Sequence, residues 1–232
     1  MRRMPGIWSR RNGGSARPRQ SPLRSNGVCR RMWMETYDVK KELKQLYHLP
    51  KEPTLVEVPS LSYLIIDGEG DPSDQAYTEA VELLFSMSYT LKMAFRKHSW
   101  YKPFTVAPLE CIWDAVEVEN RETWLWSAMI AQPGWVTEEI VSQVREQVAF
   151  KKGLSTSLVR FSPIEEGLCV TMLHVGSYQD EDASFARMEQ YCAEHQLKRS
   201  STSHREIYLS NPKKTEPDQL KTVLRFAVYP IG

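Results

Sequence analysis

The sequence of 232 residues lacks any apolar run near the roughly eighteen residues that cross a membrane. It also lacks the apolar h-region of a secretory signal. Its cysteines show neither metal-type nor redox-type spacing, and those within predicted strands or a helix are expected to act as small hydrophobes. The four are Cys29, Cys111, Cys169 and Cys192. These absences favour a protein of the reducing cytoplasm without a membrane anchor.

Acidic residues are missing from the first 33 residues, which hold nine Arg. This segment is rich in Gly, Ser and Pro and shows no hydrophobic period, so it is predicted to be disordered. An Arg-rich start is also typical of a transit peptide or of a nucleic-acid-binding tail. A third interpretation is that the segment precedes the native start, because METYDVKKELKQLYHLP from Met34 resembles an ordinary protein beginning. The folded domain is expected to cover residues 34–232.

Strong net charge is missing as well. Without residues 1–33 the chain has 21 basic and 29 acidic residues, a net charge of −8. This mildly acidic body gives no reason to expect a nucleic-acid partner. No GxSxG, P-loop, GxGxxG or HExxH motif occurs, and GEGD at residues 68–71 is interpreted as a turn. We therefore expect neither a metal nor a cofactor.

The rest of the sequence spells the pattern β, α, β, β twice. Module one covers about 55–135, a connector helix about 137–152, and module two about 155–232. Module one is predicted from a strand at 62–67, a helix at 74–97, a strand in FTVAPLECIWDAVEV and a strand in TWLWSAMIA. Module two is predicted from a strand hairpin in LVRFSPIEEGLCVTMLHV, a helix at 182–196, and strands in HREIYL and KTVLRFAVYP.

The repeat is also visible in matching segments. YLIIDGEGD aligns with TMLHVGSYQ, PLECIW with HREIYL, and SAMIAQP with LRFAVYP. The prediction is an α+β fold in which duplicated βαββ modules form an antiparallel sheet with helices on one side. A ligand cleft is expected at the pseudo-two-fold interface, because ligand sites favour such junctions.

HREIYL raises the question of a functional strand face. Glu206 and Tyr208 alternate with Ile207 and Leu209, so the two pairs point to opposite faces. The polar face is either solvated or the floor of a site. The alignment places Glu110 opposite Glu206, which predicts two acids over one cleft. In a partly dry pocket their pKa values would be pushed up and apart, so that one holds a proton while the other acts as a base.

Tryptophan is concentrated in one stretch. Five of the seven lie between residues 100 and 135: Trp100, Trp113, Trp124, Trp126 and Trp135. Either they belong to the core, or some of them wall a pocket for a flat, apolar or cationic ligand. Trp113, Trp124 and Trp126 are the candidate walls.

Two further residues are candidates for the ligand site. His174 lies on an otherwise apolar predicted strand, where it is either a base or a buried histidine bonded to the backbone. Tyr178 follows the Gly176-Ser177 turn and is expected at the mouth of the cleft.

Four segments carry a family resemblance. YLIIDGEGDP, PLECIW, LHVGSYQDED and HREIYLSNPKKTEPDQLKTVLRF resemble the GyrI-like small-molecule-binding domain, and more narrowly its stand-alone bacterial branch, over roughly residues 34–232. The resemblance implies two βαββ modules around a ligand cleft lined by aromatics. It also implies a buried acid from module two that reaches the ligand, at Glu206 here. Some relatives of this kind sense multidrug cations, and others bind gyrase.

Stand-alone members similar to this chain hydrolyse cyclopropane-bearing DNA alkylators of the yatakemycin and duocarmycin type. By that resemblance, Glu206 would hold the attacking water and Tyr208 or Tyr178 would donate a hydrogen bond. The alternatives are a binding or sensor module without chemistry, and a gyrase-modulating protein. Asp114 departs from relatives that often carry an aromatic after this Trp, so the shape or charge of that wall is expected to differ from theirs. Monomer and homodimer both remain open.

Overall fold

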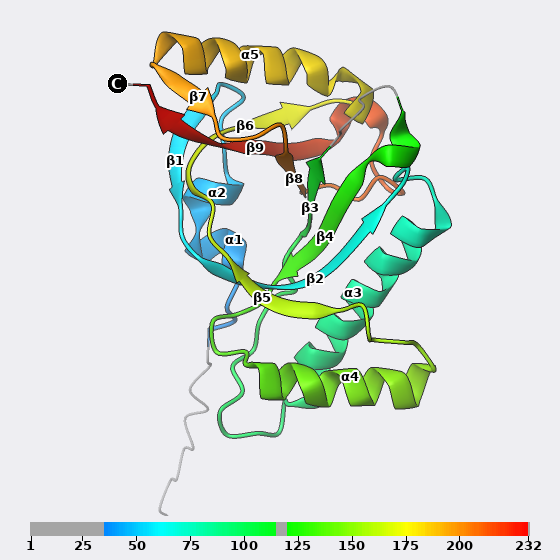
Figure 1. Ribbon diagram of the computed structural model, residues 1–232. Helices are drawn as coiled ribbons and strands as arrows, with labels where there is room; N and C mark the ends of the chain where they lie inside the picture. Colours follow the sequence, from blue (N-terminus) through cyan, green and yellow to red (C-terminus); the bar gives the residue numbers. More distant parts are fainter. Residues whose placement is uncertain (1–34, 115–119, 232) are drawn as a thin grey trace, which may run out of the picture. The chain divides into compact units, whose positions relative to one another are not determined.

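The computed structural model describes residues 35–114 and 120–231 (Figure 1). The predicted disorder of residues 1–33 and the end of the strand predicted in FTVAPLECIWDAVEV lie outside these residues. Within them, no helix combines the length and apolarity that a membrane crossing requires.

The described residues contain two modules that share the predicted order strand, helix, strand, strand, and the second module has one additional short strand, β7 (Leu197–Arg199). The first module consists of β1 (Thr54–Val58), β2 (Leu61–Glu69), α3 (Gln75–Ala94), β3 (Leu109–Asp114) and β4 (Leu125–Ala131). The second consists of β5 (Arg160–Ile164), β6 (Gly167–Val175), α5 (Glu181–Glu194), β7 (Leu197–Arg199), β8 (His204–Tyr208) and β9 (Lys221–Pro230). The other elements are α1 (Val39–Glu42), α2 (Lys44–Tyr47), α4 (Glu138–Lys152) and the 3-10 turns η1 (Arg121–Thr123), η2 (Tyr178–Asp180) and η3 (Pro217–Gln219).

All strands join one curled antiparallel sheet in the order β1-β6-β9-β8-β3-β4-β2-β5, with β7 beside β9. The modules meet at the pairing of β3 with β8. The first strand of each module crosses over, because β1 pairs with β6 and β5 pairs with β2. The predicted hairpin of β5 with β6 is therefore wrong. Turn residues mark where a chain reverses, but the partner of each strand is decided by tertiary packing.

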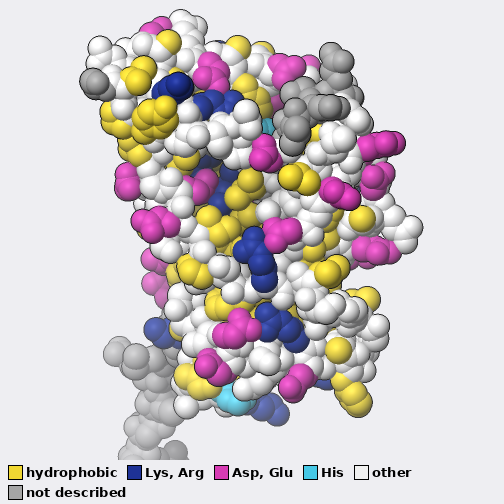
Figure 2. All heavy atoms as spheres, viewed as in Figure 1, with side chains coloured by type: hydrophobic (Ala, Val, Ile, Leu, Met, Phe, Trp, Pro, Cys, Tyr) yellow, Lys and Arg dark blue, Asp and Glu magenta, His cyan; other side chains and the backbone are white. Residues whose placement is uncertain are grey.

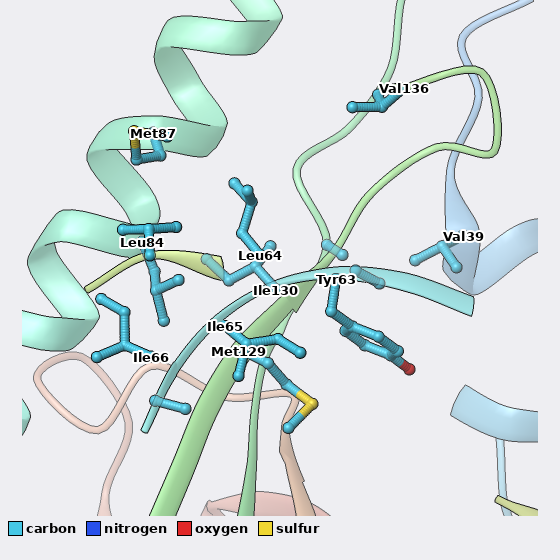
Figure 3. Close-up of a cluster of buried hydrophobic side chains, with 14 of the residues drawn as sticks. Val39, Tyr63, Leu64, Ile65, Ile66, Leu84, Met87, Met129, Ile130 and Val136 are labelled. Carbon is cyan, nitrogen blue, oxygen red and sulfur yellow. The ribbon is translucent and has the colours of Figure 1, made fainter. Parts of the chain in front are cut away.

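One face of the sheet, here called the helix face, carries both module helices. Residues paired directly across strands share a face, and one such row runs across six strands. Its members are Ile66, Ala128, Cys111, Glu206, Leu224 and Met172. Helix α5 packs Met188 and Cys192 against this row. Figure 3 shows Leu84 of α3 directed toward the Ile66 side of β2, while Tyr63 points away. The prediction of the two module helices on one side is confirmed.

The opposite face, here called the inner face, surrounds α1 and α2 within the curl of the sheet (Figure 1). Glu110 of β3 is fully buried there. Its carboxylate accepts hydrogen bonds from the Tyr47 hydroxyl at 3.0 Å, the Arg205 guanidinium at 2.7 Å and the Tyr63 hydroxyl at 3.4 Å. A buried carboxylate requires such partners, because leaving it unpaired in an apolar interior costs several kcal/mol.

A second layer of charge completes this inner-face network. Arg205 and Arg225 are cross-strand neighbours, and each is almost fully buried. Glu166 lies 3.1 Å from Nε of Arg205 and 2.8 Å from a terminal nitrogen of Arg225. With Glu110 the network holds two cations and two anions, so its formal charges cancel.

The strand register also decides which residues share a face with Glu206. Cys111 pairs with Glu206, whereas Glu110 pairs with Ile207. Glu110 and Glu206 therefore lie on opposite faces of the sheet, and the predicted pair of acids over one cleft is wrong. The alignment of PLECIW with HREIYL was displaced by one residue, which moves a side chain to the other face.

Candidate functional site

A group of polar and aromatic side chains, here called the Glu206 cluster, lies on the helix face where β3 meets β8. It draws residues from α3, β3, β4, η2, α5 and β8. Its members are Tyr77, Cys111, Trp113, Trp126, Tyr178, Glu181, Phe185, His204, Glu206 and Tyr208.

Glu206 is the carboxylate at the centre of this cluster. It is 9% exposed. Nε2 of His204, two residues earlier on β8, lies 3.2 Å from its Oε1. The His204 ring packs edge-on against Phe185 of α5, with 4.7 Å between centroids. This contact helps to fix the imidazole, which in turn orients the carboxylate.

Tyr208 lies beside Glu206 on the same face, as strand alternation predicted. Its hydroxyl accepts a hydrogen bond from Nε1 of Trp113 at 3.1 Å, and its ring meets Tyr178 edge-on at 5.9 Å. Burial, followed by the negative charge of Glu206, raises the pKa of Tyr208 well above its usual value. The phenol therefore keeps its proton at neutral pH and acts as a hydrogen-bond donor.

Aromatic rings surround the polar centre. Tyr77 of α3 lies 5.4 Å from Trp113 and 5.2 Å from Trp126, measured between ring centroids. Trp124 continues the wall, 5.9 Å from Trp113 and under the guanidinium of Arg121. The three candidate wall tryptophans are thus brought together, and Trp113 and Trp126 are buried members of the hydrophobic core, as the alternative interpretation expected. Tyr77 was missed, because its helical spacing is equally typical of a core residue.

Trp126 requires the glycine opposite it on β2. A Cβ on Gly68 would lie 2.3 Å from the indole ring. We expect Gly68→Ala to displace the ring and to lower the free energy of unfolding by about 1–3 kcal/mol, the cost of overpacking. Urea denaturation followed by tryptophan fluorescence measures this loss. Gly134→Ala is the control, since a Cβ there meets no atom within 4 Å. If Gly68→Ala were as stable as the wild-type chain, the close packing of the Trp126 indole against Gly68 would be contradicted.

Glu181 is a second carboxyl in the cluster that sequence reasoning missed. It is the first residue of α5 and is 6% exposed. Burial raises its pKa to about 9, assisted by the charge of Glu206, the charge of Asp182 and a hydrogen bond with Glu206. Acids in the first turn of a helix are usually solvated and favoured by the helix dipole. The sequence therefore carries no signal that separates Glu181 from an ordinary N-terminal acid.

Cys111 supplies the third titratable group next to Glu206. It is fully buried, and burial followed by the charge of Glu206 raises its pKa well above the usual value for a thiol. The thiolate is the nucleophilic form of cysteine. Cys111 is thus held as a thiol, and it contributes shape to the floor of the cluster.

His174 has both ring nitrogens engaged. Nδ1 lies 2.9 Å from the Ser184 hydroxyl and Nε2 lies 3.0 Å from the carbonyl oxygen of Ser177. His174 therefore links the loop after β6 to α5. Because both of its ring nitrogens have partners within the protein, neither is free for the predicted contact with a ligand.

The structure has two hollows of interest, one at the edge of the Glu206 cluster and one apart from it. One of about 540 Å³ includes Tyr178 and Ser177, so it begins at the edge of the Glu206 cluster; the remaining lining comes from Pro212, Lys213, Lys214, Thr215, Glu216, Pro217 and Leu220. The other, of about 450 Å³, is lined by Phe95, His98, Trp100, Trp135, Ile140 and Gln143. Trp100 and Trp135 are therefore separate from the other three tryptophans.

Asp114, where relatives often carry an aromatic, follows Trp113 on β3 and so points to the opposite face. Its carboxylate accepts a hydrogen bond from the Thr202 hydroxyl at 3.0 Å. The charge of Asp114 is therefore directed away from the aromatic wall.

On the view in Figure 2, acidic and basic side chains are interspersed among hydrophobic ones.

The comparisons with known proteins support the same fold. The model of the GyrI-like small molecule binding domain matches residues 51–228. An uncharacterised conserved protein from Listeria innocua is 36% identical, with a TM-score of 0.80, and a hydrolase from the same organism is 35% identical, also at 0.80. Each match covers 84% of this chain and 100% of the other.

A more distant structure shares the fold alone. EcmrR in a DNA complex is 14% identical with a TM-score of 0.50, over 83% of this chain and 61% of that chain. No curated protein matches the chain. The family model and the two Listeria innocua structures each span most of the described residues. The chain belongs to the family of the GyrI-like small molecule binding domain.

Proposed function

We propose that this protein binds planar, hydrophobic or electrophilic small molecules at the Glu206 cluster and hydrolyses those that carry a strained cyclopropane. The observation that carries the proposal is the buried carboxylate of Glu206 enclosed by aromatic rings. Aromatic walls with a few placed polar groups are typical of small-molecule sites. The relative from Listeria innocua that is described as a hydrolase supports the reaction class.

The chemistry requires a water, a base and a donor. Cyclopropane-bearing alkylators hold the strained ring in conjugation with a dienone. Glu206 accepts a proton from water as the water oxygen bonds to the ring CH2. The cyclopropane carbon–carbon bond breaks, and its electron pair passes to the carbonyl oxygen, which takes up a proton and becomes a phenol. A hydrogen bond from Tyr208 or Tyr178 to that carbonyl favours the opening, and the net change is addition of one water.

The proposal is tested by mixing purified residues 34–232, the folded unit, with a cyclopropane-bearing alkylator. Mass spectrometry should detect the ring-opened product at a rate above that in buffer. A rate equal to buffer, with the ligand bound, would favour the second candidate.

The second candidate is a binding or sequestering module without chemistry. The aromatic wall supports it, since stacking on Tyr77, Trp113 and Trp126 stabilises a flat ligand whether or not it reacts. A ligand that binds the folded state raises the melting temperature by mass action. Thermal shift with planar dyes should show this increase, and stabilisation without product formation distinguishes the two candidates.

A further inference from the structure

Glu181 is a buried carboxyl that the proposed hydrolysis does not use, and its surroundings are unfavourable for a negative charge. A glutamate is rarely fully buried without a partner. Oε1 of Glu181 is buried, and among the described residues no hydrogen-bond donor reaches it. The neighbouring group is another acid, Glu206. Two ionised carboxylates in contact repel each other, so the arrangement is stable when one of them carries a proton.

The groups around Glu181 decide which acid holds that proton. Glu206 and Asp182 add negative charge beside it, and the neutral phenol of Tyr178 lies close enough for the charge of Glu181 to act on it. His204 contacts Glu206 directly. His174 reaches α5 only through Ser184. A proton on Glu181 makes its carboxyl a hydrogen-bond donor toward Glu206 and leaves no negative charge on the buried Oε1, so the arrangement no longer places two charges side by side.

We propose that Glu181 is a second catalytic carboxyl, which shares one proton with Glu206 and delivers that proton to the carbonyl oxygen of the ligand. This inference rests on the proposed ring-opening hydrolysis. As Glu206 takes a proton from the attacking water, Glu181 gives its own to the oxygen that becomes a phenol. Glu206 is then protonated and Glu181 ionised. The proton returns to Glu181 through the hydrogen bond between them, so no other reactant is consumed.

Acidity favours Glu181 over the phenols as the proton donor. Proton transfer is most effective between groups of similar pKa, and phenols have a pKa of about 10. The pKa of Glu181 is raised to about 9, close to that of a phenolic product. The pKa of Tyr208 is raised well above its usual value by burial, which makes it a poor acid. Tyr208 and Tyr178 then supply hydrogen bonds, and Glu181 supplies the proton.

The test compares Glu181→Gln with the wild-type chain. The wild-type rate of ring opening should be flat near neutral pH and fall about tenfold per unit above pH ~9, as Glu181 loses its proton. Glu181→Gln keeps a donor but has no proton to give. Its kcat should fall about 100-fold, the smaller end of general-acid effects. The rate of the variant should no longer decline above pH ~9. Its Kd for N-methylacridone, an unreactive planar ligand, should stay within about threefold of the wild-type value.

Asp182→Asn is the matched control, because Asp182 is exposed and its substitution removes one negative charge from the same helical turn. Its kcat should stay within about threefold, with the alkaline decline moved to slightly lower pH. A kcat of Glu181→Gln within that range, or a decline above pH ~9 that persists in it, would overturn the inference.

A second measurement separates this inference from the proposed function. Carbon NMR of labelled glutamate carboxyls, without substrate, should show a group titrating near pH ~9 that is missing in Glu181→Gln. Turnover without this titration overturns the role of Glu181 alone. No turnover by the wild-type chain overturns the proposed hydrolysis, and the catalytic role of Glu181 with it, even if the shared proton is observed.

Discussion

Replacing Glu206 with Gln should lower kcat for ring opening by about 100- to 10,000-fold, the usual contribution of a general base. The amide has nearly the same shape as the carboxylate and can still contact His204, but it cannot accept a proton from water. Fold and ligand binding should therefore persist. Single-turnover kinetics with a cyclopropane-bearing alkylator measure the rate, and quenching of tryptophan fluorescence by N-methylacridone measures the Kd.

Glu194→Gln is the control for the loss of a negative charge, because Glu194 ends α5 and is exposed. Its kcat should equal that of the wild-type chain. If Glu206→Gln turned over at the wild-type rate while binding normally, Glu206 would not be the base. If it lost binding together with turnover, Glu206 would act mainly on ligand affinity.

Replacing Glu110 with Gln should lower the free energy of unfolding by about 3–5 kcal/mol, the usual cost of removing one partner of a buried ion pair. Glu110 contacts Arg205 at 2.7 Å, and both side chains are almost completely buried. The variant leaves Arg205 and Arg225 with Glu166 as the only remaining anion of the network, so one buried positive charge is uncompensated. Urea denaturation followed by circular dichroism measures the loss.

Glu189→Gln removes a carboxylate from a half-exposed pair with Arg199 and should cost no more than about 1 kcal/mol. The double variant Glu110→Gln with Arg205→Met removes one charge of each sign, so its loss should be smaller than the sum of the single losses. Equal small losses in Glu110→Gln and Glu189→Gln would contradict a structural role for the network. Such a result would return Glu110 to the list of candidate ligand residues.

Strand alternation predicted which side chains of β8 lie together. Ile207 is fully buried against the inner face, and Glu206 and Tyr208 lie on the helix face. This succeeds because the two-residue period of a strand is a local property. The duplicated βαββ order was readable for the same reason, since the turns and periods that mark each element lie within a few residues of one another.

Properties that depend on pairing between segments far apart in the chain could not be predicted from the sequence. The position of Glu110 depends on the register of β3 against β8, where an error of one residue changes the face. The partner of β5 is β2, almost one hundred residues earlier in the chain. Glu181 looks like any acid at the start of a helix until the fold places Glu206 beside it. Each of these features is created by tertiary contacts rather than by local pattern.

Hydrolysis at the Glu206 cluster is tested most directly by ring opening in water labelled with heavy oxygen. A cyclopropane-bearing alkylator incubated with the wild-type chain should give a ring-opened alcohol that carries one labelled oxygen on the former cyclopropane carbon. The product should form faster than in buffer, and Glu206→Gln should remove most of the excess rate. Product at the buffer rate, or a product whose new bond joins the ligand to the protein rather than to a labelled oxygen, would contradict hydrolysis at the Glu206 cluster.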